Sequence, residues 1–212
     1  MLTNYLKDVI SYRQLHVLDE TFVMNQCKED CCFVSADFYR DMRTAALNGP
    51  ENTLSRDYIL PDYLDVRRGY IRQKEESVQG KPVIRMNNER FAVPEVLFSP
   101  ADIGIQQMGV AECIMHAIGK LDQTCQPDLL ANIALIGGNA CLPGFKRRVH
   151  TEVRTLADCH MDVNVHCSSD PSSYAWQGAK VLANSPEFAN KLISRKEYLE
   201  KGSDFCNEKF NI

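Results

Sequence analysis

Apolar side chains recur every three or four residues along most of the chain, which places them on one face of a helix. The first stripe surrounds Thr3, a residue type that often caps a helix, and a second begins at about Thr21. Near the C-terminus, Ser194 and Glu197 match a capping box, and Gly202 is expected to close that helix. The pattern predicts helices over about residues 2–10, 21–34, 110–121, 145–156, 171–183 and 194–202.

Other segments have the pattern of strands. Residues 132–136 form a short apolar run that ends at two glycines, as a buried strand leading into a tight turn would. Residues 161–167 alternate between apolar and polar types, and residues 83–86 and 90–93 flank two asparagines in the manner of a hairpin. Between residues 58 and 80 the apolar residues follow neither the helical spacing nor the alternation of a strand, so a loop-rich insertion is expected. Helices mixed with buried strands predict an α/β fold.

Charge and cysteine content narrow the functional classes. The net charge is −4, which argues against a broad basic face for nucleic acid. The nine cysteines are scattered through apolar runs, which is typical of reduced thiols in a cytosolic or nuclear protein. The sequence has neither a signal-peptide pattern at its start nor an apolar run of about 20 residues. We therefore expect a soluble intracellular protein without membrane contact.

Five short motifs follow one another along nearly all of the 212 residues. They are a Lys-Glu helix at 28–38, Asn-Glu-Arg-Phe at 88–98, a Gly-Gly turn at 135–145, Tyr-Ala-Trp-Gln-Gly at 174–178 and Ser-Arg-Lys-Glu-Tyr at 194–198. Their order resembles that of the actin family, and the match begins partway into the family fold. The chain is thus similar to the C-terminal half of an actin-related protein.

The resemblance implies a division of the chain within the actin-like ATPase fold. Residues 1–105 would form a subdomain 4-like region, with the insertion at about 58–80 specific to one branch of the family. Residues 106–170 would form a subdomain 3-like region. The helical segment 171–212 would pack on the N-terminal half, and we expect exposed apolar surface around the helix of Trp176.

The resemblance also implies half of a nucleotide site. Lys28 and Glu29 would face the ribose and base, and the turn at Gly137, Gly138 and Asn139 would let the backbone approach the ligand. Leu142 stands where the family usually has a tyrosine against the base, and Ser172 or Ser173 stands where actin has a lysine. The alternative is a solvated helix face and a plain turn.

The family's phosphate-binding hairpins lie upstream of the matched region. Phosphate binding needs convergent backbone N–H groups and a metal held by carboxylates. The intact parent protein, which would include those hairpins, is therefore expected to be able to bind ATP or ADP. For this chain alone we expect no cofactor, no ATP hydrolysis and no catalytic residues.

Two cysteine-containing segments are candidate zinc sites. Cys159-His160 and His166-Cys167 are pairs of adjacent residues, which point to opposite faces of a strand rather than converging on a metal. Cys27, Cys31 and Cys32 have the spacing of a helix core. We therefore expect no metal site.

The insertion at 58–80 is rich in tyrosine and arginine, the residue types that anchor protein interfaces. A partner surface is the favoured interpretation, and the alternative is a loop whose aromatic residues pack back onto the body. The candidate contact residues are Tyr58, Leu60, Tyr63, Arg67, Arg68 and Tyr70.

Features that differ from actin, at residues 11–17, 58–69 and 206–212, resemble those of one nuclear actin-related protein. This implies a non-catalytic scaffold subunit of a Swr-type remodelling complex that exchanges a variant histone, with a link to heterochromatin. The implied partners are a remodeller ATPase and a small zinc-finger HIT-type subunit, with the variant histone and nucleosome contacted indirectly. The implied location is the nucleus, with some protein in the cytoplasm. The alternative is half of a cytoskeletal, filament-forming, ATP-binding protein of the actin type.

Overall fold

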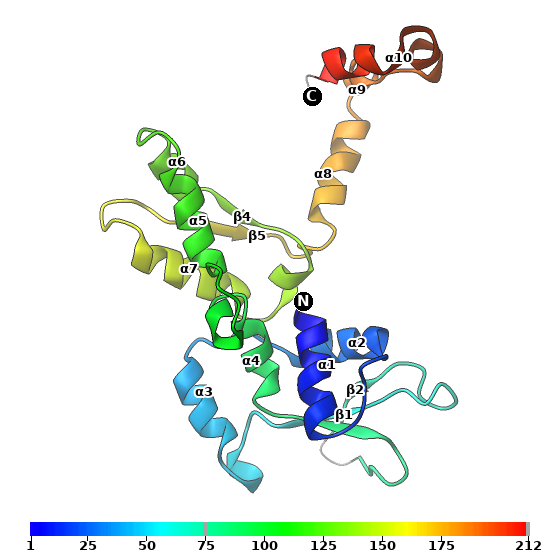
Figure 1. The fold of residues 1–212 in the computed structure, drawn as a ribbon, viewed down its shortest axis with the longest axis vertical. Coiled ribbons are helices and arrows are strands. Elements are labelled where there is room, and N and C mark those ends of the chain that lie inside the picture. Colours follow the sequence, from blue (N-terminus) through cyan, green and yellow to red (C-terminus); the bar gives the residue numbers. More distant parts are fainter. Residues whose placement is uncertain (74–75, 211–212) are drawn as a thin grey trace. The chain divides into compact units, whose positions relative to one another are not determined.

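The computed structural model describes residues 1–73 and 76–210, which form two compact units, residues 1–171 and 172–212 (Figure 1). The first unit opens with two packed helices, α1 (Leu2–Arg13) and α2 (Thr21–Cys31). The predicted apolar stripes are confirmed, since both helices bury one face in the core. The predicted cap at Thr3 is wrong. Because α1 starts at Leu2, Thr3 lies inside the first turn, and its hydroxyl bonds the side chain of Asn25 at 3.1 Å.

A three-stranded antiparallel sheet follows, in the order β2-β1-β3. Its strands are β1 (Arg56–Ile59), β2 (Tyr70–Ile71) and β3 (Val83–Met86). The expected hairpin of residues 83–86 with 90–93 is wrong, because β3 pairs with β1 and residues 90–93 belong to a helix, α4 (Glu89–Glu95). The Glu89 carboxylate accepts a hydrogen bond from the Asn87 N–H at 2.8 Å, and Phe91 and Val93 are buried. A helix buries these side chains without needing a strand partner.

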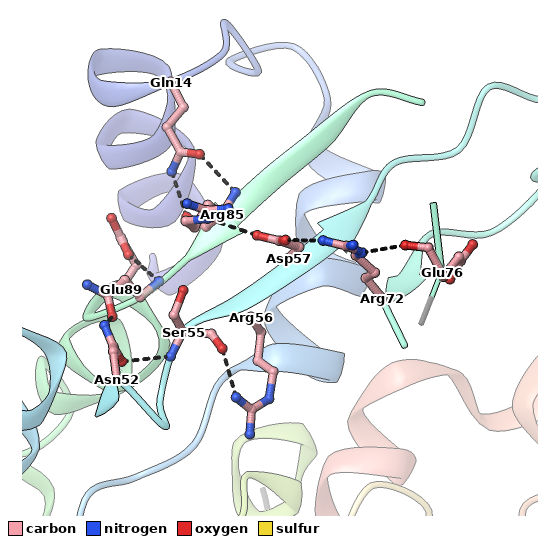
Figure 2. A network of polar contacts seen from close by, with 10 residues as sticks. Gln14, Asn52, Ser55, Arg56, Asp57, Arg72, Glu76, Arg85 and Glu89 are labelled. Carbon is pink, nitrogen blue, oxygen red and sulfur yellow. Dashed lines mark hydrogen bonds and ion pairs between the residues drawn. The ribbon is translucent and has the colours of Figure 1, made fainter. Parts of the chain in front are cut away.

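Polar contacts fix the sheet at its centre and at one edge (Figure 2). Asp57 on β1 accepts hydrogen bonds from Arg85 at 2.9 Å and Arg72 at 3.0 Å. Burial alone would raise the pKa of Asp57, but these two guanidinium groups outweigh it and lower the pKa below its usual range. At the outer edge of β3, the Gln14 side chain forms two hydrogen bonds with the Arg85 backbone, at 2.8 and 2.9 Å. The side chain of Gln14 thus takes the place of a neighbouring strand.

The second part of this unit contains α5 (Val110–Gly119), α7 (Phe145–Leu156) and a parallel pair of strands, β4 (Ile133–Leu135) and β5 (Val165–Cys167). α7 buries Phe145, Val149 and Val153, as the helical spacing predicted. The strands are shorter than predicted but lie within the expected segments. Shorter elements complete the unit: α3 (Phe38–Ala45), α6 (Gln126–Leu130), η1 (Gly49–Glu51), η2 (Pro100–Ile103) and η3 (Gly138–Cys141).

A buried ion pair joins α4 to α7. The Arg148 guanidinium donates to both carboxylate oxygens of Glu95, at 2.6 and 3.1 Å, and to the Ser35 carbonyl at 2.9 Å. It also pairs with Glu152 on its own helix and lies 5.0 Å above the ring of Phe98. Burial would lower the pKa of Arg148, but the two carboxylates outweigh it and raise the pKa. This cluster connects three parts of the chain that are distant in sequence.

The second unit contains α8 (Tyr174–Ala183), α9 (Phe188–Lys191) and α10 (Arg195–Phe210). The predicted capping box is confirmed, since Ser194 and Glu197 exchange hydrogen bonds at 2.9 and 3.2 Å. Gly202 interrupts the helix with φ 76°, but helical structure resumes after it, which the sequence did not predict. The expected apolar exposure is confirmed within this unit, where Trp176 is 65% exposed. Of the helices described, none combines the length and apolar character needed to cross a membrane.

Candidate nucleotide half-site and partner surface

Lys28 and Glu29 lie near the C-terminal end of α2, where Asn25 holds them together. The Lys28 ammonium donates to the Asn25 side-chain oxygen at 2.8 Å and to the Thr3 hydroxyl at 3.1 Å. The Asn25 amide donates to Glu29 at 2.7 Å. An ammonium group has three donors and a carboxylate has two oxygens, so each side chain keeps hydrogen-bonding capacity for a ligand. The contacts with Asn25 and Thr3 restrict the rotamers of the pair before any ligand arrives.

The glycine turn begins directly after β4. Gly137 has φ 95°, a conformation that favours glycine, and its N–H donates to the Pro171 carbonyl at 2.8 Å. No described atom lies within 4 Å of where a Cβ would stand on Gly137 or Gly138, so the space beside the turn is open. Asn139 is exposed. Leu142 is 6% exposed and packs in the core, so it is not available as an open apolar surface for a base.

The backbone after α2 meets the backbone after this turn. The Val34 N–H donates to the Pro143 carbonyl at 2.8 Å. A Cβ on Gly144, which has φ 87°, would stand only 2.3 Å from the Val34 carbonyl oxygen. Between Lys28 or Glu29 and residues 137–139, the described part of the chain contains no direct hydrogen bond or ion pair. The two halves of the expected site are therefore coupled through the backbone at Val34 and Gly144.

These groups suit the adenosine part of a nucleotide. Glu29 can accept from ribose hydroxyls, Lys28 can donate to ring or hydroxyl acceptors, and the open glycine turn allows close backbone approach. Within residues 1–73 and 76–210, no three or more histidine, cysteine, aspartate or glutamate side chains are grouped so as to hold a metal ion.

The two cysteines of α2, and the one directly after it, are core residues, as predicted. Cys27, Cys31 and Cys32 are each at most 2% exposed. The hydrogen bond with Cys31 and burial raise the pKa of the Cys27 thiol, and burial raises the pKa of Cys32 to about 12. Both thiols are therefore protonated at neutral pH, which makes them poor nucleophiles.

Part of the expected partner surface is buried. Tyr58 is 0% and Leu60 is 8% exposed, so the expectation that they lie on an exposed partner surface is wrong. The reason is that β1 extends into the expected insertion and directs Tyr58 into the core, where its hydroxyl donates to Asp30 at 3.1 Å. Burial raises the pKa of Tyr58. Gly69 crosses this ring so closely that a Cβ there would stand 2.6 Å from it.

The exposed part of this surface is the loop of residues 61–68. The Asp62 carboxylate accepts hydrogen bonds from three successive backbone N–H groups, of Leu64, Asp65 and Val66, at 2.8 to 3.0 Å. Tyr63 has φ 61° and is 63% exposed, and Leu64 is 86% exposed. Arg68 forms an ion pair with Asp30 at 3.0 Å, and Arg67 is exposed. Tyr70 is half-buried and donates to Glu76.

The comparison with protein families decides the family. The model of the actin family matches residues 6–211. The chain belongs to the actin family. The expected fold class, an α/β chain from the C-terminal half of the actin-like fold, is therefore confirmed, whereas its division at residue 105 stays a prediction.

Several relatives in the actin family are similar along nearly the whole chain. Actin-related protein 6 of Drosophila melanogaster is 39% identical over 211 residues, which cover 98% of this chain and 53% of that protein. Actin-related protein 6 of Arabidopsis thaliana is 40% identical over 233 residues, covering 98% and 55%. The actin-like protein arp6 of Emericella nidulans is 38% identical over 234 residues, covering 99% and 49%. The chain spans about half the length of these relatives.

Proposed function

We propose that this actin-family chain is part of a non-catalytic scaffold subunit of a nuclear, Swr-type chromatin-remodelling complex that exchanges a variant histone. The observation that carries the proposal is the similarity to proteins named Actin-related protein 6 over 98–99% of the chain. The divergence from actin at residues 11–17, 58–69 and 206–212 supports the same branch. A link to heterochromatin belongs to this proposal as well.

In this role the chain would contribute binding surfaces. The loop of residues 61–68 presents Tyr63 and Leu64 at its tip, with Arg67 beside them. Asp62 already fixes the backbone of this loop. The loop would therefore lose little conformational entropy when a partner binds its tip. The remodeller ATPase and the small zinc-finger HIT-type subunit are the proposed partners. The variant histone and the nucleosome would be reached through them.

Nucleotide would have a structural role in this proposal. Lys28, Glu29 and the turn at 137–139 would hold the adenosine of ATP or ADP in the intact protein. When bound, the nucleotide would link α2 to the segment after β4, which already meet at Val34 and Pro143. No residue of this chain is assigned a step in hydrolysis.

Fractionation of cells tests the proposed location and assembly. Nuclear and cytoplasmic extracts would be sedimented on a gradient, and the intact protein followed across the fractions with actin as the control. The protein is expected in the nuclear extract, in fractions of a large complex that also contain a remodelling ATPase. Intact protein recovered mainly as a free species in the cytoplasm would contradict the proposal.

A further inference from the structure

A cavity of about 590 Å³, lined mainly by residues with polar side chains, lies on the first unit beside β1 and β2. Its volume is in the range of small-molecule sites. The walls come from the turn before β1, from β1 itself and from the segment after β2 (Figure 2). They consist of Pro50, Asn52, Thr53, Ser55, Arg56, Asp57, Ile71, Arg72 and Gln73.

The turn that forms one wall is held in place by Asn52. The Asn52 side-chain oxygen accepts hydrogen bonds from the N–H groups of Leu54 at 3.1 Å and Ser55 at 3.0 Å. Its amide donates to the Ala45 carbonyl at 3.1 Å and to Asn87 at 3.0 Å. All of the polar atoms of this side chain are therefore used to fix the turn, and the cavity wall is preorganised.

Positive charge is in excess along this wall. The Nη1 group of Arg56 donates hydrogen bonds to the carbonyls of Thr53 at 2.8 Å and Ser55 at 2.7 Å. No described carboxylate forms an ion pair with Arg56. Its Nε and Nη2 groups, with three N–H donors, are left for another acceptor. Asp57 is the one carboxylate among the described lining residues, and Arg85 and Arg72 occupy both of its oxygens.

A neighbouring arginine strengthens this field. Arg90 donates to the Cys31 carbonyl at 2.8 Å and to the Leu54 carbonyl, so the carbonyls of residues 53–55 face two guanidinium groups. Burial lowers the pKa of Arg90, and the charge of Arg56 lowers it further. Neither guanidinium forms an ion pair with a carboxylate in residues 1–73 and 76–210. Two cations held together without a counter-ion are stabilised when an anion binds beside them.

The wall also carries free hydroxyl groups. No described residue forms a hydrogen bond with the side-chain hydroxyl of Thr53 or Ser55, although both line the cavity with Arg56. Arg72 faces the same cavity. Its Nε group donates a hydrogen bond to the Glu76 carbonyl and its Nη1 group to the Asp57 carboxylate, which leaves the Nη2 group for a ligand. Guanidinium groups and hydroxyls together match the several acceptor oxygens and multiple charge of a phosphate group.

We propose that this cavity binds the phosphate group of a small phosphorylated ligand, with Arg56 as the main contact and Thr53, Ser55 and Arg72 as further donors. The site lies outside the residues of the nucleotide half-site, and it does not depend on the proposed scaffold role. The free N–H groups of Arg56 would bind two phosphate oxygens in parallel. The Thr53 and Ser55 hydroxyls would donate to the remaining oxygens.

Calorimetric titration of the purified 212-residue chain with pyrophosphate tests the proposal. Saturable binding is expected, and Arg56→Gln should weaken it at least about tenfold because it removes the charged fork. Arg147→Gln is the matched control, since it removes an exposed arginine of α7 that does not line the cavity, and it should leave binding unchanged. Thr53→Val with Ser55→Ala provides a second variant that retains every arginine, and it should also weaken binding.

Three results would overturn the proposal. The first is the absence of saturable binding by the unaltered chain. The second is equal weakening by Arg56→Gln and Arg147→Gln, which would indicate general charge attraction. The third is binding of citrate as tightly as pyrophosphate, which would show that the cavity does not select phosphate. Circular dichroism spectra of the variants would identify any that fail to fold. If Arg56→Gln fails to fold, the variant with Thr53→Val and Ser55→Ala decides the outcome.

Discussion

Replacement of Arg148 by methionine should lower the free energy of unfolding by about 3–5 kcal/mol, because it leaves a buried carboxylate without its partner. The side chain of Glu95 is 7% exposed and that of Arg148 is 17% exposed, so water cannot easily replace the lost contact. The substitution also removes the hydrogen bond to the Ser35 carbonyl and the contact with the ring of Phe98. Methionine fills similar space, so the effect comes from the lost ion pair and hydrogen bond rather than from a cavity.

Urea denaturation of the 212-residue chain, followed by far-ultraviolet circular dichroism, measures this effect. Arg147→Met is the control, since it removes an exposed arginine from the same helix, and it should change stability by less than about 0.5 kcal/mol. Adding Glu95→Leu to Arg148→Met should restore part of the loss, because the buried carboxylate is then absent and Glu152, whose side chain is 30% exposed, can be hydrated. An Arg148→Met chain within about 1 kcal/mol of the unaltered chain would contradict the importance of this ion pair.

Replacement of Gly144 by alanine should destabilise the chain by about 2–4 kcal/mol, from backbone strain and overpacking together. Gly144 has φ 87°, and an added Cβ would stand 2.3 Å from the carbonyl oxygen of Val34. That oxygen belongs to the backbone, so it cannot move aside as the end of a side chain could. The contact would force apart the segments that join α2 to the turn after β4.

Gly49→Ala separates strain from the clash. Gly49 has φ 62°, but no described atom lies within 4 Å of its Cβ position. Its replacement should therefore cost only the strain of a left-handed residue, about 1 kcal/mol. Thermal unfolding of both variants gives the comparison. Equal losses of stability for Gly49→Ala and Gly144→Ala would show that the close approach at Val34 does not matter.

The helices of this chain were predictable because their signals are local. The spacing of Leu2, Leu6 and Ile10, or of Phe145, Val149 and Val153, is visible within a dozen residues. The strand partners were not predictable in the same way, since pairing depends on contacts between distant segments. The sequence pattern predicts a hairpin of residues 83–86 with the segment that follows them, whereas their partner β1 lies more than 20 residues upstream. A short apolar run such as 90–93 fits a strand or a helix equally well.

The candidate sites were predictable only in part, for a related reason. Lys28, Glu29 and the glycine turn could be named from motifs, but the role of Asn25 in holding the first two depends on side-chain geometry. The sequence pattern places Tyr58 and Leu60 on a surface because they belong to a segment rich in tyrosine and arginine, and tyrosine occurs in interfaces as well as in cores. Arg56 is not predictable as a site residue, since one arginine between polar residues carries no sequence signal. The Asp62 side chain before Tyr63 and Leu64 is a local turn signal that could have indicated a fixed loop tip.

Affinity purification of the intact protein from nuclear extract, with mass spectrometry of the co-purifying subunits, tests the scaffold role most directly. We predict recovery of a remodeller ATPase and a variant histone. Their yield should fall by about tenfold or more when Tyr63 and Leu64 are both replaced by serine, because a few anchors carry most interface energy. Tyr39→Ser is the control, since Tyr39 is 77% exposed on α3. Recovery of mainly actin and filament-binding proteins would contradict the proposed role and favour a cytoskeletal protein.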